Sequence, residues 1–144
     1  MTEELRARMD RFVEFINSAD EKIGREVVAP SAIFHVPFLP EPVQGPTGYL
    51  DIIDVMRQAF PDVQWSLEET IIEGNAVAAR FTLRGTHEGD FLGVPGTGKS
   101  IQTQAMNIYR LENGQIIEEH GLPDLFGLMI QIGAIDTPGG DDRD

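Results

Sequence analysis

The sequence predicts one α+β domain in which helices pack against one face of a curved, mostly antiparallel sheet. Apolar residues recur at helical spacing over much of residues 2–60, whereas residues 63–122 alternate in polarity and are divided by turn signals. Helices followed by a run of hairpins are typical of this class. The 144 residues suit a single domain with a buried core, which we place at residues 1–135.

Two amphipathic helices are expected in the first sixty residues. The first begins near Thr2, a suitable N-cap. Its apolar side chains recur at steps of three and four, at Leu5, Met9, Phe12, Val13 and Ile16. A shorter helical piece is expected over 20–28. Thr47 is the expected cap of the second long helix, over 48–60.

The remaining elements are strands, with one last helix. A short strand over 31–37 and a proline-rich loop over 39–46 separate the helices. Tight turns at Gly74-Asn75 and Asn113-Gly114 indicate hairpins. The longer strands are expected over 64–73, 76–87, 100–111 and 115–122. An apolar helix over 125–133 closes the domain.

Residues 93–100 match the phosphate-binding loop pattern GxxxxGK[ST], but their context argues against a nucleotide site. Such a loop must run directly into a helix, whose N-terminal amides hold the phosphates. The residues after Ser100 are instead rich in β-branched and aromatic types, and the hairpin signal Asn113-Gly114 follows them. Pro95 also removes one of the amides. We therefore expect a connection between two strands.

Composition restricts the partners that the protein can have. Lys and Arg number 11 against 24 Asp and Glu, a formal net charge of −13, which repels nucleic acid and anionic membranes. The absence of cysteine excludes disulfides and thiolate chemistry. No signal peptide and no stretch near the ~20 apolar residues of a membrane span are found, so we expect a cytoplasmic protein. The acidic residues 136–144 predict a disordered tail.

The turn at Asn113-Gly114 predicts which polar side chains share one face of the last hairpin. With a two-residue turn and regular pairing, Tyr109 lies opposite Glu118, and Asn107 lies opposite His120. Directly opposed residues point to the same side of a sheet. These four side chains are therefore expected to meet on one wall.

Asp124 extends that wall and is a candidate acid/base. A carboxylate at the mouth of an apolar cavity, beside His120 or Asn107, can abstract a proton next to a carbonyl, and its neighbours can stabilise the enolate. Gln104 is a second candidate donor to the enolate oxygen. Asp124 also precedes an apolar helix, so it can equally be that helix's N-cap. A carboxylate exposed to solvent and bonded to the helix amides would favour the cap.

Other candidates also have two interpretations. His35 lies in an apolar strand, where an ionisable group needs a partner, so it is either structural or functional. Trp65 and Tyr49 serve either packing or substrate contact. Arg80 is either a charge on the sheet face or a substrate-binding group. The three histidines are widely separated in the sequence, so we expect no metal site.

Seven short stretches, spread over about residues 5–135, resemble the SnoaL-like polyketide cyclases, a family of nuclear-transport-factor-like α+β cone proteins. They are 34–37 (FHVP), 59–62 (AFPD), 85–95 (GTHEGDFLGVP), 97–99 (TGK), 112–116 (ENGQI), 119–124 (EHGLPD) and 131–133 (QIG). The resemblance also accounts for the phosphate-loop match, because the family carries a Pro-Thr-Gly-Lys/Arg turn between these strands.

The resemblance implies a cone of sheet and helices around an apolar pocket, commonly assembled as a homodimer. It implies ring closure by intramolecular aldol chemistry on an apolar carbonyl compound, without cofactor or metal. The acid/base of the family lies at the position of Asp124, and a pocket histidine resembles His35. The same fold also hosts ketosteroid-type isomerases, epoxide hydrolases and non-catalytic binding modules, and these alternatives remain open. Hydrolysis would require Arg80 or Arg84 near Asp124.

Overall fold

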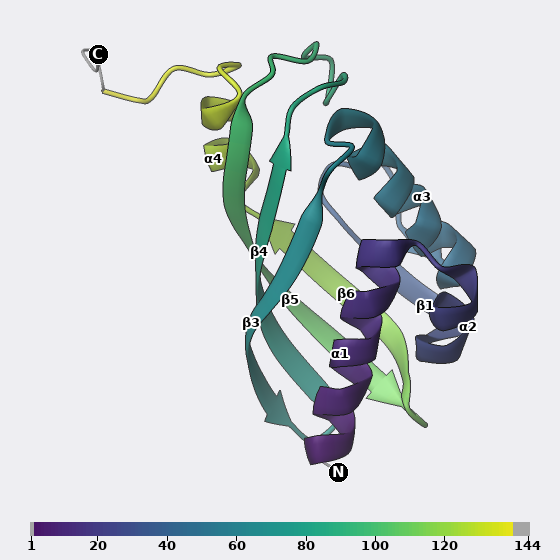
Figure 1. Ribbon diagram of the computed structural model, residues 1–144. Helices are drawn as coiled ribbons and strands as arrows, with labels where there is room; N and C mark the ends of the chain where they lie inside the picture. Colours follow the sequence, from purple (N-terminus) through teal and green to yellow (C-terminus); the bar gives the residue numbers. More distant parts are fainter. Residues whose placement is uncertain (1, 140–144) are drawn as a thin grey trace.

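The computed structural model describes residues 2–139 (Figure 1). Its helices are α1 (Thr2–Ser18), α2 (Glu21–Val27), α3 (Gly45–Ala59) and α4 (Leu125–Gln131). Its strands are β1 (Val28–His35), β2 (Val43–Gln44), β3 (Gln64–Glu73), β4 (Ala76–Thr86), β5 (Ser100–Glu112) and β6 (Gln115–Pro123). The end of the predicted acidic tail, 140–144, lies outside the described residues.

The strands form one mixed, curved sheet in the order β2-β1-β6-β5-β4-β3. Strands β3 to β6 pair antiparallel, and β1 joins β6 in parallel. Helices α1, α2 and α3 cover one face of this sheet, which leaves much of the opposite face uncovered (Figure 1). The predicted α+β class and mostly antiparallel sheet are confirmed. No helix of residues 2–139 has the length and apolarity to cross a bilayer.

Two elements begin three residues earlier than expected. Helix α3 begins at Gly45, with Gln44 at its N-cap, so the expected cap at Thr47 is wrong. Pro46 explains the earlier start, because its fixed φ and missing amide suit the first turn of a helix. Strand β1 begins at Val28, three residues before the expected start.

The phosphate-loop match is a strand connection, as predicted. Residue Thr86 at the end of β4 pairs with Ser100 at the start of β5, and 87–99 contain neither helix nor named strand. The loop is fixed instead by backbone hydrogen bonds from Thr97 N and Gly98 N to the His87 carbonyl. It therefore lacks the helix that a phosphate site needs.

An aromatic cluster joins the helices to the sheet. Phe12 of α1 packs edge-on against Tyr49 of α3 and Tyr109 of β5, with ring centroids 5.3 and 5.5 Å apart. All three residues are buried. Each such pair contributes about 0.5–1.5 kcal/mol beyond the area it buries. This cluster adjoins the cavity described below, since Tyr49 belongs to the cluster and also lines the cavity.

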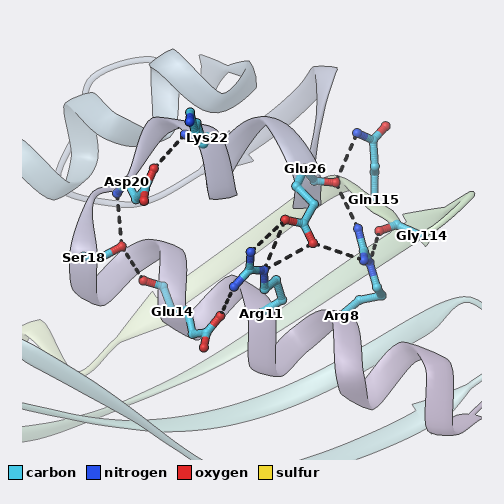
Figure 2. A network of polar contacts seen from close by, with 9 residues as sticks. All are labelled: Arg8, Arg11, Glu14, Ser18, Asp20, Lys22, Glu26, Gly114 and Gln115. Atoms are coloured by element: carbon cyan, nitrogen blue, oxygen red, sulfur yellow. Dashed lines mark hydrogen bonds and ion pairs between the residues drawn. The ribbon is translucent and has the colours of Figure 1, made fainter.

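A polar network fixes α1 and α2 against the β5–β6 turn (Figure 2). Arg8 Nε donates to the Gly114 carbonyl at 2.6 Å, and its Nη2 donates to the Glu26 carbonyl at 3.0 Å. Arg11 forms an ion pair with the Glu26 carboxylate at 3.0 Å. Exposed pairs of this kind contribute little individually. Their effect is positional, because they hold α1 and α2 beside the turn that joins β5 and β6.

Candidate functional site

The β5–β6 hairpin contains a bulge that the sequence analysis does not anticipate. Beside the turn, Leu111 pairs with Ile116 as expected. The next pair is Arg110 with Glu118, so Ile117 has no partner on β5. The predicted pairing of Tyr109 with Glu118 is therefore wrong. One extra residue in a strand moves every later residue by one position.

The bulge brings a residue that the sequence analysis did not select onto the inner face. Tyr109 pairs with Glu119, and Asn107 pairs with Gly121. Glu119 is only 1% exposed, whereas the side chains of its neighbours Glu118 and His120 are 36% and 56% exposed. Glu119, rather than His120, is thus the ionisable group beside Asn107 and Tyr109.

Glu119 and Asn107 line a cavity between the sheet and α3. Its volume is about 60 Å³. The wall residues are Val36, Phe38, Tyr49, Ile52, Met56, Trp65, Leu83, Thr103, Gln104, Ala105, Asn107, Glu119, Gly121 and Pro123. Most are apolar, and Glu119 is the one acidic group among them. This combination of an apolar wall with a few polar groups is typical of small-molecule sites, although such sites usually have about 300–1,000 Å³.

Three hydrogen bonds connect Glu119 and Asn107 of the cavity wall with each other and with the buried Tyr109. The Glu119 Oε2 atom accepts from the Tyr109 hydroxyl and from Asn107 Nδ2, both at 3.2 Å. Asn107 Nδ2 also donates to the Tyr109 hydroxyl at 3.0 Å. The amide orientation of Asn107 is fixed because its Oδ1 accepts from Leu122 N at 3.0 Å.

The second carboxyl oxygen of Glu119 has no partner. Among the described residues, Oε1 is buried without any hydrogen bond. A buried polar atom in this state is rare in folded proteins, and a catalytic role is one of its recognised explanations. Glu119 therefore has one oxygen anchored by Tyr109 and Asn107 and one buried oxygen without a partner among the described residues.

Burial determines the protonation of these groups. Removal from water raises the pKa of Glu119 to about 8, against the lowering effect of the Tyr109 hydrogen bond. Burial also raises the pKa of Tyr109 and of Tyr49, and the nearby Glu119 adds to both. At neutral pH, Glu119 is thus mostly a neutral carboxylic acid, and the ionised form is the minor one.

Four of the residues expected at a site come together in the cavity wall. Tyr49 and Asn107 are largely buried in it, Trp65 is half-buried, and Gln104 is an exposed wall residue. Trp65 is held by Asn17 of α1, whose amide exchanges two hydrogen bonds with the Trp65 backbone at 2.8 and 3.0 Å. The cavity wall is therefore tied to the helix layer.

Asp124 lies outside the cavity wall. Its side chain is exposed, and Oδ1 accepts from Gly127 N at 2.9 Å, so it caps α4. A Cβ at position 127 would lie 2.3 Å from Asp124 Oδ2, so the glycine leaves the room that this cap needs. Asp124 adjoins the wall only through its backbone, which donates to the Gln104 carbonyl at 2.8 Å. This geometry fits the interpretation of Asp124 as the N-cap of α4.

The other three expected site residues lie on the outer face of the sheet. His35 and His120 stack on each other beside a separate depression, and neither lines the cavity. Arg80 pairs with Glu69 at 3.1 Å on the outer face. Arg84 likewise does not line the cavity, so no arginine of the described residues does.

Comparisons of sequence identify relatives of this chain. A family model described as SnoaL-like polyketide cyclase matches residues 6–132. The chain is 30% identical over 130 residues to the aklanonic acid methyl ester cyclase DnrD of Streptomyces peucetius, covering 85% of this chain and 86% of the relative. It is also 30% identical over 91 residues to the nogalonic acid methyl ester cyclase of Streptomyces nogalater, covering 62% of this chain and 67% of that protein.

Solved structures share the fold. Wild-type IdmH from Streptomyces antibioticus superimposes with a TM-score of 0.79 at 28% identity, covering 90% of this chain and 98% of that one. TsrD from Streptomyces laurentii gives a TM-score of 0.82 at 24% identity, covering 94% and 98%. The likeness to TsrD, at its lower identity, shows only that the fold is shared.

Proposed function

Because the chain belongs to the SnoaL-like polyketide cyclase family, we propose that it closes a ring in an apolar carbonyl compound by intramolecular aldol chemistry, with Glu119 as the acid/base. One observation carries the residue assignment: Glu119 is a buried carboxyl group in an apolar cavity, anchored through Oε2 and unpartnered at Oε1. The function class is the one expected from the sequence. The acid/base is a different residue.

A single carboxyl group can serve both proton transfers of this reaction. Ionised Glu119 removes a proton from the carbon next to a carbonyl, which leaves an enolate and a neutral Glu119. The enolate carbon attacks a second carbonyl of the same molecule, so one C–C bond forms and an alkoxide results. Glu119 then returns its proton to that alkoxide. The product has the mass of the substrate, and the enzyme is unchanged.

Asn107 and Tyr109 position the acid for this cycle. Their donors hold Oε2, so the unpartnered Oε1 is the atom that exchanges the proton. A base works best when its pKa is close to the working pH, and burial brings Glu119 toward that condition. Tyr49 and Gln104 are further wall residues that can contact the substrate, as expected from the sequence.

Substrate size requires the cavity wall to move. A cavity of about 60 Å³ holds one or two waters, far less than a multi-ring molecule. Phe38, Met56 and Trp65 are the bulky wall side chains whose displacement would admit the reacting part of a substrate. From the names of the relatives we propose the methyl ester of a polyketide acid as the substrate class.

The catalytic roles expected for Asp124, His120 and His35 remain predictions. We rank Glu119 ahead of them because it is the acidic group that lines the cavity. Epoxide hydrolysis loses its support, since it requires an arginine beside the acid and no described arginine lines the cavity. A non-catalytic binding module is the second candidate, favoured by the small cavity and its filling by Phe38, Met56 and Leu83.

The experiment is a turnover assay with the purified full chain and a chelator, using aklanonic and nogalonic acid methyl esters. We expect a product of unchanged mass and new retention time. Glu119→Gln should lower the rate by about 10²–10⁴, the usual contribution of acid–base catalysis. Glu118→Gln is the matched control, because it makes the same change one residue away on the outer face.

Three outcomes separate the candidates. Loss of turnover only in Glu119→Gln supports the proposal. Loss in Asp124→Asn, with Glu119→Gln active, would assign the acid/base to Asp124 instead. Ligand-dependent thermal stabilisation without turnover by any variant would favour the binding module.

A homodimer and a cytoplasmic location are further proposals for this chain. The outer face carries exposed apolar side chains that a second copy would cover, namely Ile71, Met106, Ile108 and Leu122. Exposed apolar patches of this kind commonly mark protein contacts. Light scattering after size exclusion tests the dimer, and Met106→Glu should weaken it.

A further inference from the structure

A second polar cluster lies on the outer face of the sheet and takes no part in the chemistry proposed for the cavity. His35 of β1 and His120 of β6 pair across the parallel ladder. Their rings stack with centroids 4.4 Å apart and planes within 2°. Glu118 lies two positions before His120 on the same face, and its Oε2 is 3.0 Å from His120 Nε2.

We propose that His35, Glu118 and His120 bind a first-row divalent metal ion, with Ni²⁺, Cu²⁺ and Zn²⁺ preferred. Each residue offers one ligand atom, and the three atoms lie within 4.8 Å of one another. Two imidazole nitrogens and one carboxylate oxygen are a donor set that suits these ions. In a tetrahedral site with bonds of about 2.0–2.1 Å, ligand atoms are about 3.3 Å apart. Because each imidazole binds a metal in its own ring plane, the two stacked rings would have to tilt apart so that both planes meet at the ion.

The overall charge of the protein favours a bound cation, and a neighbouring side chain orients one of the ligands. The formal net charge of −13 attracts positive ions to the surface. Arg110 Nε lies 3.5 Å from the other carboxylate oxygen of Glu118, Oε1, which orients the group and leaves Oε2 toward His120. Such a contact to a ligand's unused atom is how proteins commonly fix metal-binding carboxylates.

The cluster also has room for additional ligands. A depression of about 400 Å³ adjoins both imidazoles and is lined in addition by Leu39, Glu41 and Leu122. Three protein ligands leave at least one coordination position, which water or an oxygen donor in this depression would fill. The sequence predicts no metal site, because His35 and His120 are far apart in the chain. The parallel pairing of their strands brings them together.

The test uses the full chain, stripped of metal with a chelator and then dialysed. Calorimetric titration with Ni²⁺ should give one ion bound per chain. Electron paramagnetic resonance of the Cu²⁺ form should show coupling to two nitrogens. His35→Ala and His120→Ala should each weaken Ni²⁺ binding by more than about tenfold, because one of three donors is lost. Glu69→Gln, an acidic residue on the same outer face, is the control and should bind as wild type does.

Stability measurements keep the outcome interpretable. All variants are compared by thermal unfolding, and Glu118→Gln is included because it removes a ligand charge at nearly constant shape. Weakened binding in folded His120→Ala and Glu118→Gln supports the site. Unchanged Ni²⁺ binding in the His35→Ala/His120→Ala double variant, or no binding by wild type, would overturn it. The readout is independent of cyclase activity, so failure here leaves the Glu119 assignment untouched.

Discussion

The two faces of β6 differ sharply in chemistry although their residues are neighbours in the sequence. Glu119 points inward, is 1% exposed and has one unpartnered oxygen, whereas Glu118 and His120 point outward and pair with each other. The same type of side chain is thus a buried acid at Glu119 on one face and a member of an exposed cluster at Glu118 on the other. Side-chain alternation along the strand separates the two environments completely.

The comparison teaches that the bulge at Ile117 decides which residue enters the cavity. Without the unpaired residue, Glu118 and His120 would lie opposite Tyr109 and Asn107, as the sequence analysis expects. With it, Glu119 takes that place. A single inserted residue therefore selects the acid, because shifting a strand by one position exchanges its faces.

The largest expected effect is the pH dependence of stability that Glu119 causes on the inner face. Glu119 has a folded pKa of about 8 against an ordinary value near 4.5, so between these values the folded protein holds more protons than the unfolded chain. The free energy of unfolding should therefore fall as pH rises through this window, by on the order of 1 kcal/mol per pH unit, and level off above about pH 8. Urea unfolding at several pH values, with chelator present, measures the slope.

Glu119→Gln is the control for this slope, because it removes the titrating group at nearly constant shape. Subtracting its stability at each pH isolates the Glu119 contribution from the other acidic residues. A difference that does not change between pH 5 and 8 would contradict the buried-acid description.

The β5–β6 hairpin also shows which features of the fold and the site the sequence can predict. Asn113-Gly114 identified the turn, and alternation identified the strands, because both are local signals. The bulge depends on how two strands fit within the whole sheet, so no local pattern announced it. Glu119 was visible in sequence only as part of the EHGLPD stretch. The meeting of His35 and His120 was likewise hidden, since it depends on a long-range parallel pairing.

Tyr109 and Arg110, adjacent residues of β5 on opposite faces, should differ in their effect on the cyclisation rate. Tyr109→Phe removes a donor to Glu119, so the cyclisation rate should fall about tenfold, since a hydrogen bond to a charged group contributes about 1.5 kcal/mol or more. The pH–rate profile should also move to higher pH, because that hydrogen bond lowers the pKa of Glu119. Arg110→Gln, on the outer face, should change neither the rate nor the profile. Equal losses in both variants would point to general destabilisation.

The smallest effect concerns Asp124. Asp124→Ala should cost about 1 kcal/mol of stability through loss of the α4 cap, whereas Asp124→Asn should cost little because asparagine caps equally well. If capping is its only role, Asp124→Asn keeps wild-type turnover. Thermal unfolding and the turnover assay together separate the two roles. A folded Asp124→Asn protein without activity would restore the catalytic interpretation.

The most direct measurement is exchange of the substrate proton next to the carbonyl, followed by NMR in deuterated water with aklanonic acid methyl ester. It reports enolate formation itself, before ring closure. Wild type and Glu118→Gln should exchange this proton at equal rates, and Glu119→Gln should be slower by about 10²–10⁴. Exchange by Glu119→Gln at the wild-type rate would contradict the account.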